Sequence, residues 1–474
     1  MLKGLEISEV RVCDLDLNDR IDAEYFNKQD LKILSSLKHC GSVEFRTLGE
    51  FFASAFYPAA TQLYESGDVP FARCVDCISH PVITHAQDSS FERIPSDFIS
   101  DNKGVSDLRR GDIIITKVGT PCYASIIHEH DRVALSRTVM GIGNVSGIDP
   151  YYLLVFLRSK YGFSQLMRQR ELTIQYQLTL ERVKRILVYK PTDCFQQAIR
   201  KFVFSSLEKE KESLRQYGEA EQSLLSELGF DGWIPTEESV SVKNCSDFMS
   251  AGRFDAEYFQ PKYDELFTLL AKCKVRVLGG KDGLVDIKRS IEPGSDAYSD
   301  KGIPFVRIAD FTEMGVASPE IHIPPELCSD SPRPKKDTIL LSKDGSVGIA
   351  YKVEEDLDVV TSSGILHLTV KDNAVLPDYL TLVLNSKLVR LQAERSAGGS
   401  IIQHWKQSEI ENVSIPILPM SSQQKIAAKV RESFALRAES KRLLDLAKHA
   451  VEVAIEQGES KALEALEKEI GHAN

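Results

Sequence analysis

The heptapeptide Arg20-Ile-Asp-Ala-Glu-Tyr-Phe26 recurs far along the chain as Arg253-Phe-Asp-Ala-Glu-Tyr-Phe259, with six of seven residues identical. A second pair follows in the same order, because Val69-Pro-Phe-Ala-Arg73 matches Ile303-Pro-Phe-Val-Arg307. The period far exceeds the roughly 20–50 residues of solenoid repeats, so each copy is predicted to be a whole domain.

A third matching pair predicts the secondary structure inside each copy. Ile113-Ile-Ile-Thr-Lys-Val-Gly119 and Ile339-Leu-Leu-Ser-Lys-Asp-Gly345 each read as a buried strand that ends in a Lys-x-Gly turn. Other strand-length segments bounded by Gly, Pro, Asp and Asn surround them, and short helices are expected near residues 151–160 and 379–387. Each copy is therefore predicted to be an α+β domain with a strongly bent sheet.

A long helix is expected after each copy, and both helices show apolar residues in a heptad pattern. The heptad residues of the first helix, expected over 194–229, are Val203, Leu207, Leu214, Tyr217, Leu224 and Leu228. Those of the second, within 420–474, are Ile426, Val430, Phe434, Leu444, Val451 and Ile455. A single amphipathic helix of this length is not stable alone in water. The two helices are therefore predicted to pair antiparallel as a coiled-coil stalk, related by a pseudo-two-fold axis.

The composition is that of an ordinary globular protein. The chain has 474 residues, of which 42% are hydrophobic and 27% charged, and a net charge of −11. No apolar run is long enough for a signal peptide or a membrane span. The nine cysteines are an odd number spread over a long chain, which is typical of free thiols in a reducing compartment. We therefore expect a cytoplasmic protein that does not enter a membrane.

The duplicated order of globular part and helix resembles the specificity (S) subunit of type I DNA restriction-modification systems, which act in phage defence. The matching heptapeptides, the strand-to-Lys-x-Gly segments and the helix entries at Pro191 to Ile199 and Pro419 to Ile426 carry this resemblance. It implies two target-recognition domains, each reading one half of a bipartite, asymmetric site in double-stranded DNA. The implied order is domain 1 over 1–193, spacer helix 194–229, linker 230–252, domain 2 over 253–419 and spacer helix 420–474.

The same resemblance implies the partners. The stalk is expected to dock two methyltransferase (M) subunits, and restriction/translocase (R) subunits are a further expected partner. No cofactor is expected on this chain, because S-adenosylmethionine and ATP would bind the partner subunits. The chain itself would then carry no catalysis.

The acidic balance of the chain limits how it could bind DNA. The net charge is −2 over residues 1–193, −7 over 233–419 and 0 over 420–474, so no region is basic overall. Neutralisation of phosphates supplies most of the non-specific affinity for DNA. We therefore expect weak binding by the isolated chain, base readout by this chain, and phosphate clamping largely by partner subunits.

The candidate DNA contacts that recur in both copies lie around the predicted strands. A Lys beside Gly and a hydroxyl can approach a phosphate closely, although a solvated Lys in a turn is an equally good reading. The recurring Arg could read a guanine or could form a structural ion pair. The candidates are Lys117 with Thr120, Lys343 with Ser346, Arg73, Arg307, and the basic residues Arg109, Arg110, Arg333 and Lys335.

Better candidates for base readout lie where the two copies differ, because the two half-sites should differ. Amide side chains can pair with adenine, and glycines permit a close backbone approach. The first copy offers Tyr57 and the loop residues Gln175, Tyr176 and Gln177, and the second offers Ser400, Gln403 and His404. An ordinary polar loop remains the alternative for any one of these residues.

Cys74 and Cys77 with His80 and His85 are candidate ligands of a zinc site. No second Cys pair lies at a suitable distance, and the second copy has Ile308 and Phe311 at the places of the two cysteines. We therefore expect no metal at this motif.

Two other classes of function stay open from the sequence. The chain could be a methyltransferase or nuclease with unfamiliar motifs, although it has no Walker-type loop, no Asn-Pro-Pro-aromatic motif and no His-Glu-x-x-His segment. It could also be a coiled-coil scaffold that does not contact DNA. The acidic residues of the two heptapeptides could serve in acid/base chemistry, but an architectural role at the domain edge is favoured.

Overall fold

The protein is described by a computed structural model that covers residues 8–12, 15, 20–171, 177–238, 240–317, 319, 321–398 and 403–471. The chain forms two compact units. Unit 1 comprises Met1–Lys211 and Arg437–Asn474, and unit 2 comprises Glu212–Leu436. The two long helices, α7 (Asp193–Glu227) and α13 (Met420–Gln457), therefore each contribute one part to either unit.

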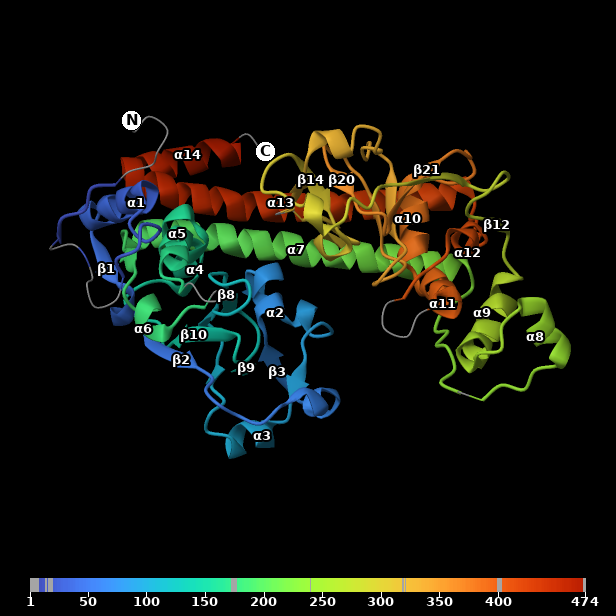
Figure 1. Ribbon diagram of the computed structural model, residues 1–474, viewed down its shortest axis with the longest axis horizontal. Coiled ribbons are helices and arrows are strands. Elements are labelled where there is room, and N and C mark those ends of the chain that lie inside the picture. Colours follow the sequence, from blue (N-terminus) through green and yellow to red (C-terminus); the bar gives the residue numbers. More distant parts are fainter. Residues whose placement is uncertain are drawn as a thin grey trace. The chain divides into compact units, whose positions relative to one another are not determined.

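Unit 1 is a mixed α/β structure (Figure 1). Its helices, besides its parts of α7 and α13, are α1 (Lys28–His39), α2 (Cys74–Ser79), α3 (Ser96–Asp101), α4 (Pro150–Arg158), α5 (Lys160–Arg168), α6 (Leu180–Val183) and α14 (Glu459–Gly471). Its strands are β1 (Ser42–Glu44), β2 (Glu50–Ala53), β3 (Val69–Ala72), β4 (Val82–Ile83), β5 (Arg93–Ile94), β6 (Asp107–Leu108), β7 (Ile113–Thr116), β8 (Ala124–Ile127), β9 (Val133–Leu135), β10 (Val139–Gly143) and β11 (Leu187–Tyr189).

The central sheet of unit 1 has the strand order β2-β10-β7-β8-β4. Its middle strand is β7, whose four residues are all buried, as the apolar run in the sequence predicts. A second sheet has the order β5-β3-β9-β6, in which β3 and β9 run parallel. Helix α4 packs its apolar residues into the core; it begins at Pro150, where the Asp149 side chain accepts hydrogen bonds from the Tyr151 and Tyr152 N–H groups.

Unit 2 is also mixed. Its helices, besides its parts of α7 and α13, are α8 (Cys245–Ala251), α9 (Pro261–Leu270), α10 (Pro377–Asn385), α11 (Lys387–Ser396) and α12 (Gln407–Glu411). Its strands are β12 (Val275–Val277), β13 (Val285–Arg289), β14 (Ile303–Val306), β15 (Phe311–Thr312), β16 (Gly315–Val316), β17 (His322–Ile323), β18 (Ile339–Ser342), β19 (Ala350–Lys352), β20 (Val360–Thr361), β21 (Ile365–Val370) and β22 (Ser414–Pro416). Helix α8 lies in the segment 230–252 that was predicted to be a linker.

The sheets of unit 2 follow the same connectivity as those of unit 1. The order β13-β21-β18-β19 corresponds to β2-β10-β7-β8, and the parallel pair β14–β20 corresponds to β3–β9. Strand β18 is again a buried central strand. The described sheets differ at their edges, because β4 extends the central sheet of unit 1 beyond β8 and β6 extends its second sheet beyond β9.

In unit 1, the first part of α7 packs against the last part of α13. The Ser206 and Ser440 hydroxyls lie 2.8 Å apart, and the two side chains are nearly inaccessible to solvent. Glu210 lies close enough to Arg437 for their charges to interact, and burial raises the pKa of Glu210, an effect that Arg437 opposes. The residue numbers of these contacts rise along α7 and fall along α13, so the two helices run antiparallel in unit 1.

In unit 2, the remaining parts of the two helices make the same kind of contact. The Ser213 and Ser433 hydroxyls lie 3.0 Å apart, and Lys429 forms an ion pair of 2.7 Å with Glu219. The small serines occupy inward positions that the predicted heptads assigned to larger neighbours. Ser213 is 1% exposed, whereas Leu214 is 36% exposed.

The phase of the helices therefore differs from the prediction at Leu214, because a small residue in the contact lets two helix backbones approach closely and leaves the bulkier one on the flank. Of the other predicted heptad residues, Val203, Leu224, Ile426, Val430 and Val451 are buried, whereas Leu207, Leu228, Phe434 and Leu444 are partly buried against the cores.

The two heptapeptides have the same architectural role. In unit 1, Arg20 pairs with the Asp two residues on and donates a hydrogen bond of 2.7 Å to the Arg170 carbonyl, just past the end of α5. In unit 2, Arg253 makes the equivalent ion pair and donates a hydrogen bond of 3.0 Å to the Ser396 carbonyl at the end of α11. These contacts favour the architectural interpretation of the heptapeptides over an acid/base one.

The described part of the chain contains no helix that is both long enough and apolar enough to cross a membrane.

Candidate functional site

The loop after β7 in unit 1 is built on one buried hydroxyl. Thr116 donates a hydrogen bond of 2.8 Å to the Thr120 carbonyl and accepts one of 2.9 Å from the Tyr123 N–H. This tether folds residues 117–122 into a tight turn that presents Lys117 and Thr120. Gln177 lies against the turn, because it forms an antiparallel bridge with Val118. The structure thus brings together three residues that the sequence analysis singled out.

Lys117 is half-buried, and this burial lowers the pKa of its ammonium group. No ion pair joins Lys117 to a described acidic residue. A cation held at a turn without a described carboxylate partner can approach a phosphate or a base edge.

The loop after β18 in unit 2 is built in the same way. Ser342 donates a hydrogen bond of 2.5 Å to the Ser346 carbonyl and accepts one of 2.9 Å from the Ile349 N–H. Lys343, which follows Ser342, forms an ion pair of 2.5 Å with Asp344. Asp344 also accepts a hydrogen bond of 2.8 Å from His404 Nδ1 when this nitrogen carries the proton.

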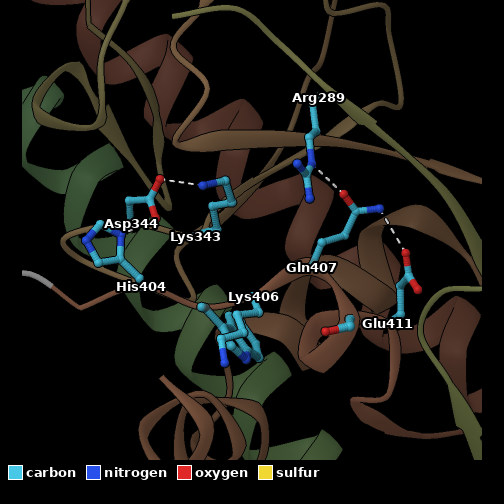
Figure 2. A pocket seen from close by; sticks show the side chains of 9 residues that line it. Arg289, Lys343, Asp344, His404, Lys406, Gln407 and Glu411 are labelled. Carbon is cyan, nitrogen blue, oxygen red and sulfur yellow. Dashed lines mark hydrogen bonds and ion pairs between the residues drawn. The ribbon is translucent and has the colours of Figure 1, made fainter. Parts of the chain in front are cut away.

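The charge of Asp344 is stabilised in this arrangement. Burial disfavours the charged carboxylate, but the hydrogen bonds from Lys343 and His404 outweigh burial and lower the pKa of Asp344. Asp344 therefore orients both basic side chains, which flank its carboxylate, and all three residues line a cavity (Figure 2).

The cavity has a volume of about 490 Å³ and a strongly polar wall. Its lining residues are Arg289, Lys343, Asp344, His404, Trp405, Lys406, Gln407, Ser408 and Glu411. Arg289 donates a hydrogen bond of 2.6 Å to Gln407, which in turn donates one of 2.8 Å to Glu411 (Figure 2).

Several donors of this cavity are available to a ligand. Arg289 and Lys406 are exposed, and no ion pair ties either of them to a carboxylate of the described residues. Trp405 is 1% exposed, and its Nε1 has no hydrogen-bond partner within the described part of the chain. Buried donors are almost always paired, so an unpaired one beside two cations favours an anionic or polar ligand at this place.

Backbone contacts define which residues of the two sites correspond. The Lys117 carbonyl accepts from the Leu178 N–H, and the Lys343 carbonyl accepts from the Trp405 N–H. Gln177 therefore corresponds to His404, and Thr179 to Lys406.

The strand registers extend this correspondence to the rest of the cavity wall. Ala53 of β2 pairs with Met140, and Arg289 of β13 pairs with Leu366, so Ala53 and Arg289 hold the same position in their sheets. The same backbone frame thus carries cations in unit 2 and small neutral residues in unit 1.

Other predicted cations lie at the opposite end of the central strands. Arg109 and Arg110 precede β7, and Arg333 and Lys335 precede β18, so a strand of about 13 Å separates them from Lys117 and Lys343. Arg110 donates a hydrogen bond to the Glu129 carbonyl, Arg333 lies 3.5 Å from Asp358, and Lys335 lies 3.0 Å from Asp356. These residues do not join the two loop sites.

Arg73 and Arg307 make ion pairs with carboxylates of their own units. Arg73 lies 3.3 Å from Asp76 and 3.1 Å from Glu92, and Arg307 lies 3.2 Å from Asp310. These pairs favour the structural interpretation of the recurring arginine, and DNA contact by either residue stays a prediction.

Tyr57 differs from its predicted place in a polar loop. Its ring is 5% exposed and packs edge-on against Phe71 and Phe98, and its hydroxyl accepts a hydrogen bond of 3.0 Å from the Arg137 N–H. Apolar packing of the ring thus leaves Tyr57 without a free surface for DNA.

Three of the predicted readout residues, Gln175, Tyr176 and Ser400, lie outside the described residues. Gln403 lies at the site, where its carbonyl accepts a hydrogen bond of 2.9 Å from the Gly345 N–H. Arg289 and Lys406 were missed in the sequence. Lys406 could have been found two residues after His404, whereas Arg289 ends a strand whose pairing the sequence does not show.

Residues 282–442 match the sequence model that describes the type I restriction modification DNA specificity domain. The matched range includes all the residues that line the cavity around Lys343 and His404. None of the curated proteins matches the chain.

Solved structures also resemble the chain. The S subunit of the type-I restriction-modification system from M. genitalium is 11% identical, over 90% of this chain and 95% of that chain, with a TM-score of 0.35. The HsdS subunit from Thermoanaerobacter tengcongensis is 18% identical, over 74% of this chain and 82% of that chain, with a TM-score of 0.27.

Proposed function

We propose that this chain is the non-catalytic DNA sequence-specificity subunit of a type I restriction-modification complex. Two target-recognition domains, over 1–193 and 253–419, each read one half of a bipartite, asymmetric site in double-stranded DNA. The observation that supports this best is a specificity-domain match that includes a cation-lined loop site, together with a second loop site of the same backbone design in unit 1.

The residues of the two sites are assigned different tasks. Arg289 and Lys406 contact phosphates, because they are exposed cations without described carboxylate partners. His404 in unit 2 and Gln177 in unit 1 contact base edges, because they hold corresponding positions at the loops. Since an imidazole and an amide read different edges, the two half-sites differ in sequence.

The helices α7 and α13 are proposed to form an antiparallel coiled-coil stalk that sets the spacing of the half-sites. The buried serine pairs and the ion pair between Lys429 and Glu219 support this pairing within each unit. The outer faces of the stalk dock two M subunits and, through the complex, R subunits. S-adenosylmethionine and ATP bind to those partner subunits.

Methylome sequencing tests the proposed function directly. Cells with the gene should methylate one bipartite motif that cells without it leave unmodified, and the gene returned on a plasmid should restore that motif. An unchanged methylome would contradict the DNA-specificity role and favour the scaffold. Methyl transfer by the pure chain with S-adenosylmethionine would contradict the non-catalytic assignment.

The proposed spacer role has its own test. Lengthening α7 and α13 together, by equal in-register insertions, should lengthen the spacer between the two half-motifs in the same methylome assay. A fixed spacer in the lengthened protein would exclude the stalk as the ruler.

A further inference from the structure

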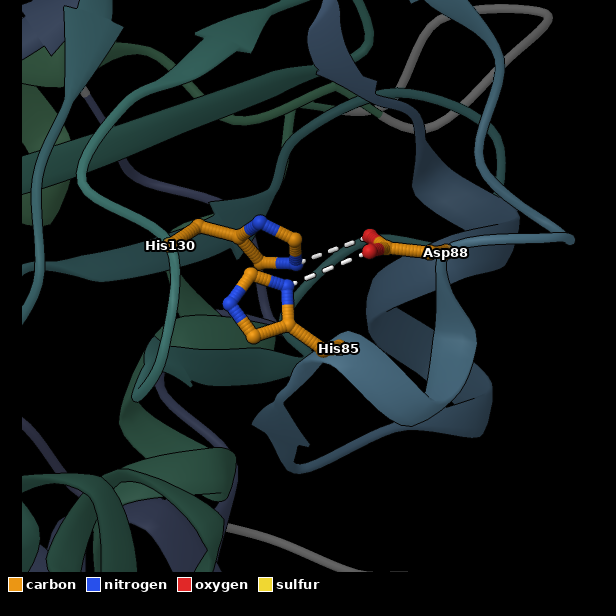
Figure 3. A group of neighbouring side chains, drawn as sticks. All are labelled: His85, Asp88 and His130. Atoms are coloured by element: carbon orange, nitrogen blue, oxygen red, sulfur yellow. Dashed lines mark hydrogen bonds and ion pairs between the residues drawn. The ribbon is translucent and has the colours of Figure 1, made fainter.

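A group of metal-binding side chains lies in unit 1, apart from the loop site. His85 and Asp88 come from the turn after β4, and His130 comes from the turn between β8 and β9 (Figure 3). His85 Nδ1 lies 3.1 Å from one Asp88 oxygen, and His130 Nε2 lies 3.3 Å from the other. One donor atom from each of the three residues lies within 4.8 Å of the others.

The backbone around the group is held in place by hydrogen bonds, and a cation would replace the contact of 3.3 Å between His130 Nε2 and the Thr84 carbonyl. The Thr84 N–H donates a hydrogen bond of 2.7 Å to the Gln87 side chain, and the His85 N–H donates one of 2.8 Å to the Glu129 carboxylate. The second of these bonds ties the turn after β4 to the turn before β9, so both histidines are presented from backbone that is already fixed.

The burial of His130 and Asp88 also favours a bound ligand at this group. His130 is 5% exposed, and its ring lies 4.4 Å from the ring of His85, centre to centre. Asp88 Oδ1 is shielded from solvent and makes no hydrogen bond of good geometry with the described residues, although Arg93 and His130 lie near it. Burying a carboxylate oxygen without a well-formed hydrogen bond is unfavourable, so a bound cation would stabilise it.

We propose that His85, Asp88 and His130 bind one divalent cation of the zinc class, with water at the fourth position. Two imidazoles and a carboxylate are a donor set that zinc accepts, with bonds of about 2.0–2.2 Å. In a tetrahedron with such bonds, neighbouring donors lie about 3.3–3.6 Å apart. The His–Asp separations of 3.1 and 3.3 Å, one to each carboxylate oxygen, are close to such edges, so a cation fits once Asp88 turns one oxygen towards both histidines.

Arg93 is the group that competes with the cation. Its guanidinium lies 3.1 Å from Asp88, but it also donates a hydrogen bond of 2.8 Å to the Asp68 carbonyl. This second anchor lets Arg93 stay in place as an outer partner of the carboxylate while Asp88 turns one oxygen to the cation.

The site differs from the Cys-x-x-Cys motif considered in the sequence. Cys77 is fully buried, and the Cys74 thiol donates a hydrogen bond to the Thr120 carbonyl, away from the histidines. The segment 353–359 of unit 2, which joins β19 and β20 as the His130 turn joins β8 and β9, contains no histidine. The cation would therefore belong to one unit only.

The proposed role of the cation is to fix the β8–β9 turn. Glu129 of this turn accepts a hydrogen bond of 2.9 Å from Arg110 at its carbonyl. A cation on His130 would thus stiffen the turn on which this predicted DNA contact rests.

Zinc titration of the purified full chain tests the proposal. After chelation and dialysis, calorimetry with Zn²⁺ should give one site per chain, and elemental analysis after gel filtration should recover one zinc. His85→Asn should weaken zinc binding by at least the roughly 10–100-fold that loss of an outer partner causes. His85 is exposed, so the metal-free variant should melt at the same temperature as the metal-free wild type.

Matched variants make the result decisive. His80→Asn and Cys74→Ser should bind zinc like the wild type, whereas Asp88→Asn should lose it. No retained zinc in the wild type, or unchanged binding by His85→Asn, would overturn the proposal. Loss of zinc only in Cys74→Ser would instead assign it to the cysteine motif. The readout is metal content, so failure here leaves the proposed DNA role untouched.

Discussion

The loop sites of the two units share a backbone and differ in the side chains it carries. Thr116 and Ser342 tether equivalent turns, and Lys117 and Lys343 follow them at equivalent places. Around this frame, unit 2 carries His404 where unit 1 carries Gln177. The difference teaches that buried strand residues and one hydroxyl build the loop, whereas exposed positions are free to set its chemistry. Four experiments test this comparison.

The largest expected effect comes from the cations present in unit 2 alone. In the assembled complex, Arg289→Gln with Lys406→Gln should weaken DNA binding by about 100-fold or more, since each charged hydrogen bond contributes about 1.5–3 kcal/mol. The slope of log affinity against log salt should fall by about 0.9 for each lost phosphate contact. Fluorescence anisotropy over a salt series measures both.

The exposed Lys272 is a control for general charge in unit 2. Lys272→Gln should leave both the affinity and the salt slope nearly unchanged. An equal loss in this control would mean that overall charge, and not the cavity, binds the DNA.

The next effect concerns which half of the target is read. His404→Ala should relax the preference at one half-motif, and Gln177→Ala should relax it at the other. A good base contact discriminates by about 1–3 kcal/mol, or roughly 10–100-fold at one base pair. Methylome sequencing of each variant shows which half changes. Relaxation of the same half by both variants would contradict the correspondence of the two sites.

A third experiment tests a feature that both units share, the inward-facing serines of the long helices. Ser213→Leu should lower the free energy of unfolding by about 1–3 kcal/mol, because a large side chain would be forced into a close contact. Leu214→Ser, at the exposed neighbour, should change it by less than about 0.5 kcal/mol. Chemical denaturation of the two variants measures both values. A larger loss of stability in Leu214→Ser than in Ser213→Leu would support the heptad phase predicted from the sequence.

The fourth experiment uses a buried histidine of unit 2 whose position in unit 1 is held by a glycine. His367 of β21 holds the position of Gly141 in β10, and burial lowers its pKa to about 4. Below pH 6.5 the unfolded chain takes up a proton that the folded chain does not, so stability falls as the pH drops towards 4. The slope from this group approaches about 1.4 kcal/mol per pH unit.

His367→Gln should remove this contribution, since glutamine can keep a hydrogen bond to Thr361 without titrating. As the pH falls from 7 to 5, the melting temperature of the wild type should therefore drop relative to that of the variant. Parallel curves would show that His367 does not titrate between the two states.

The sequence predicted the parts of the fold that buried apolar runs determine. The strands β7 and β18 were found because four successive buried residues leave a clear signal, and α7 was found from its heptads. The phase of α7 was not predicted. The apolar Leu214 was expected to be buried in place of its polar neighbour Ser213, but close packing of the helices buries Ser213 instead.

The sites were predicted to a smaller extent, for a similar physical reason. Lys117, Lys343, Gln177 and His404 follow or face recognisable strands, so repeat matching was enough to find them. Arg289 reaches the cavity because β13 pairs with β21 in the sheet, and a linear sequence pattern does not encode this pairing. Tyr57 was misplaced because an aromatic residue between polar and small neighbours gives no sign of its burial.

The serine pairs also limit how the gene can change in length. Ser206 and Ser213 are seven residues apart on α7, as are Ser433 and Ser440 on α13. An insertion preserves the facing of small residues only if it adds a multiple of seven codons, and each such step adds about 10.5 Å of helix. That is roughly three base-pair steps of DNA. Under the proposed ruler, viable length variants therefore carry in-frame duplications in multiples of 21 nucleotides, and their target spacers grow in jumps of about three base pairs.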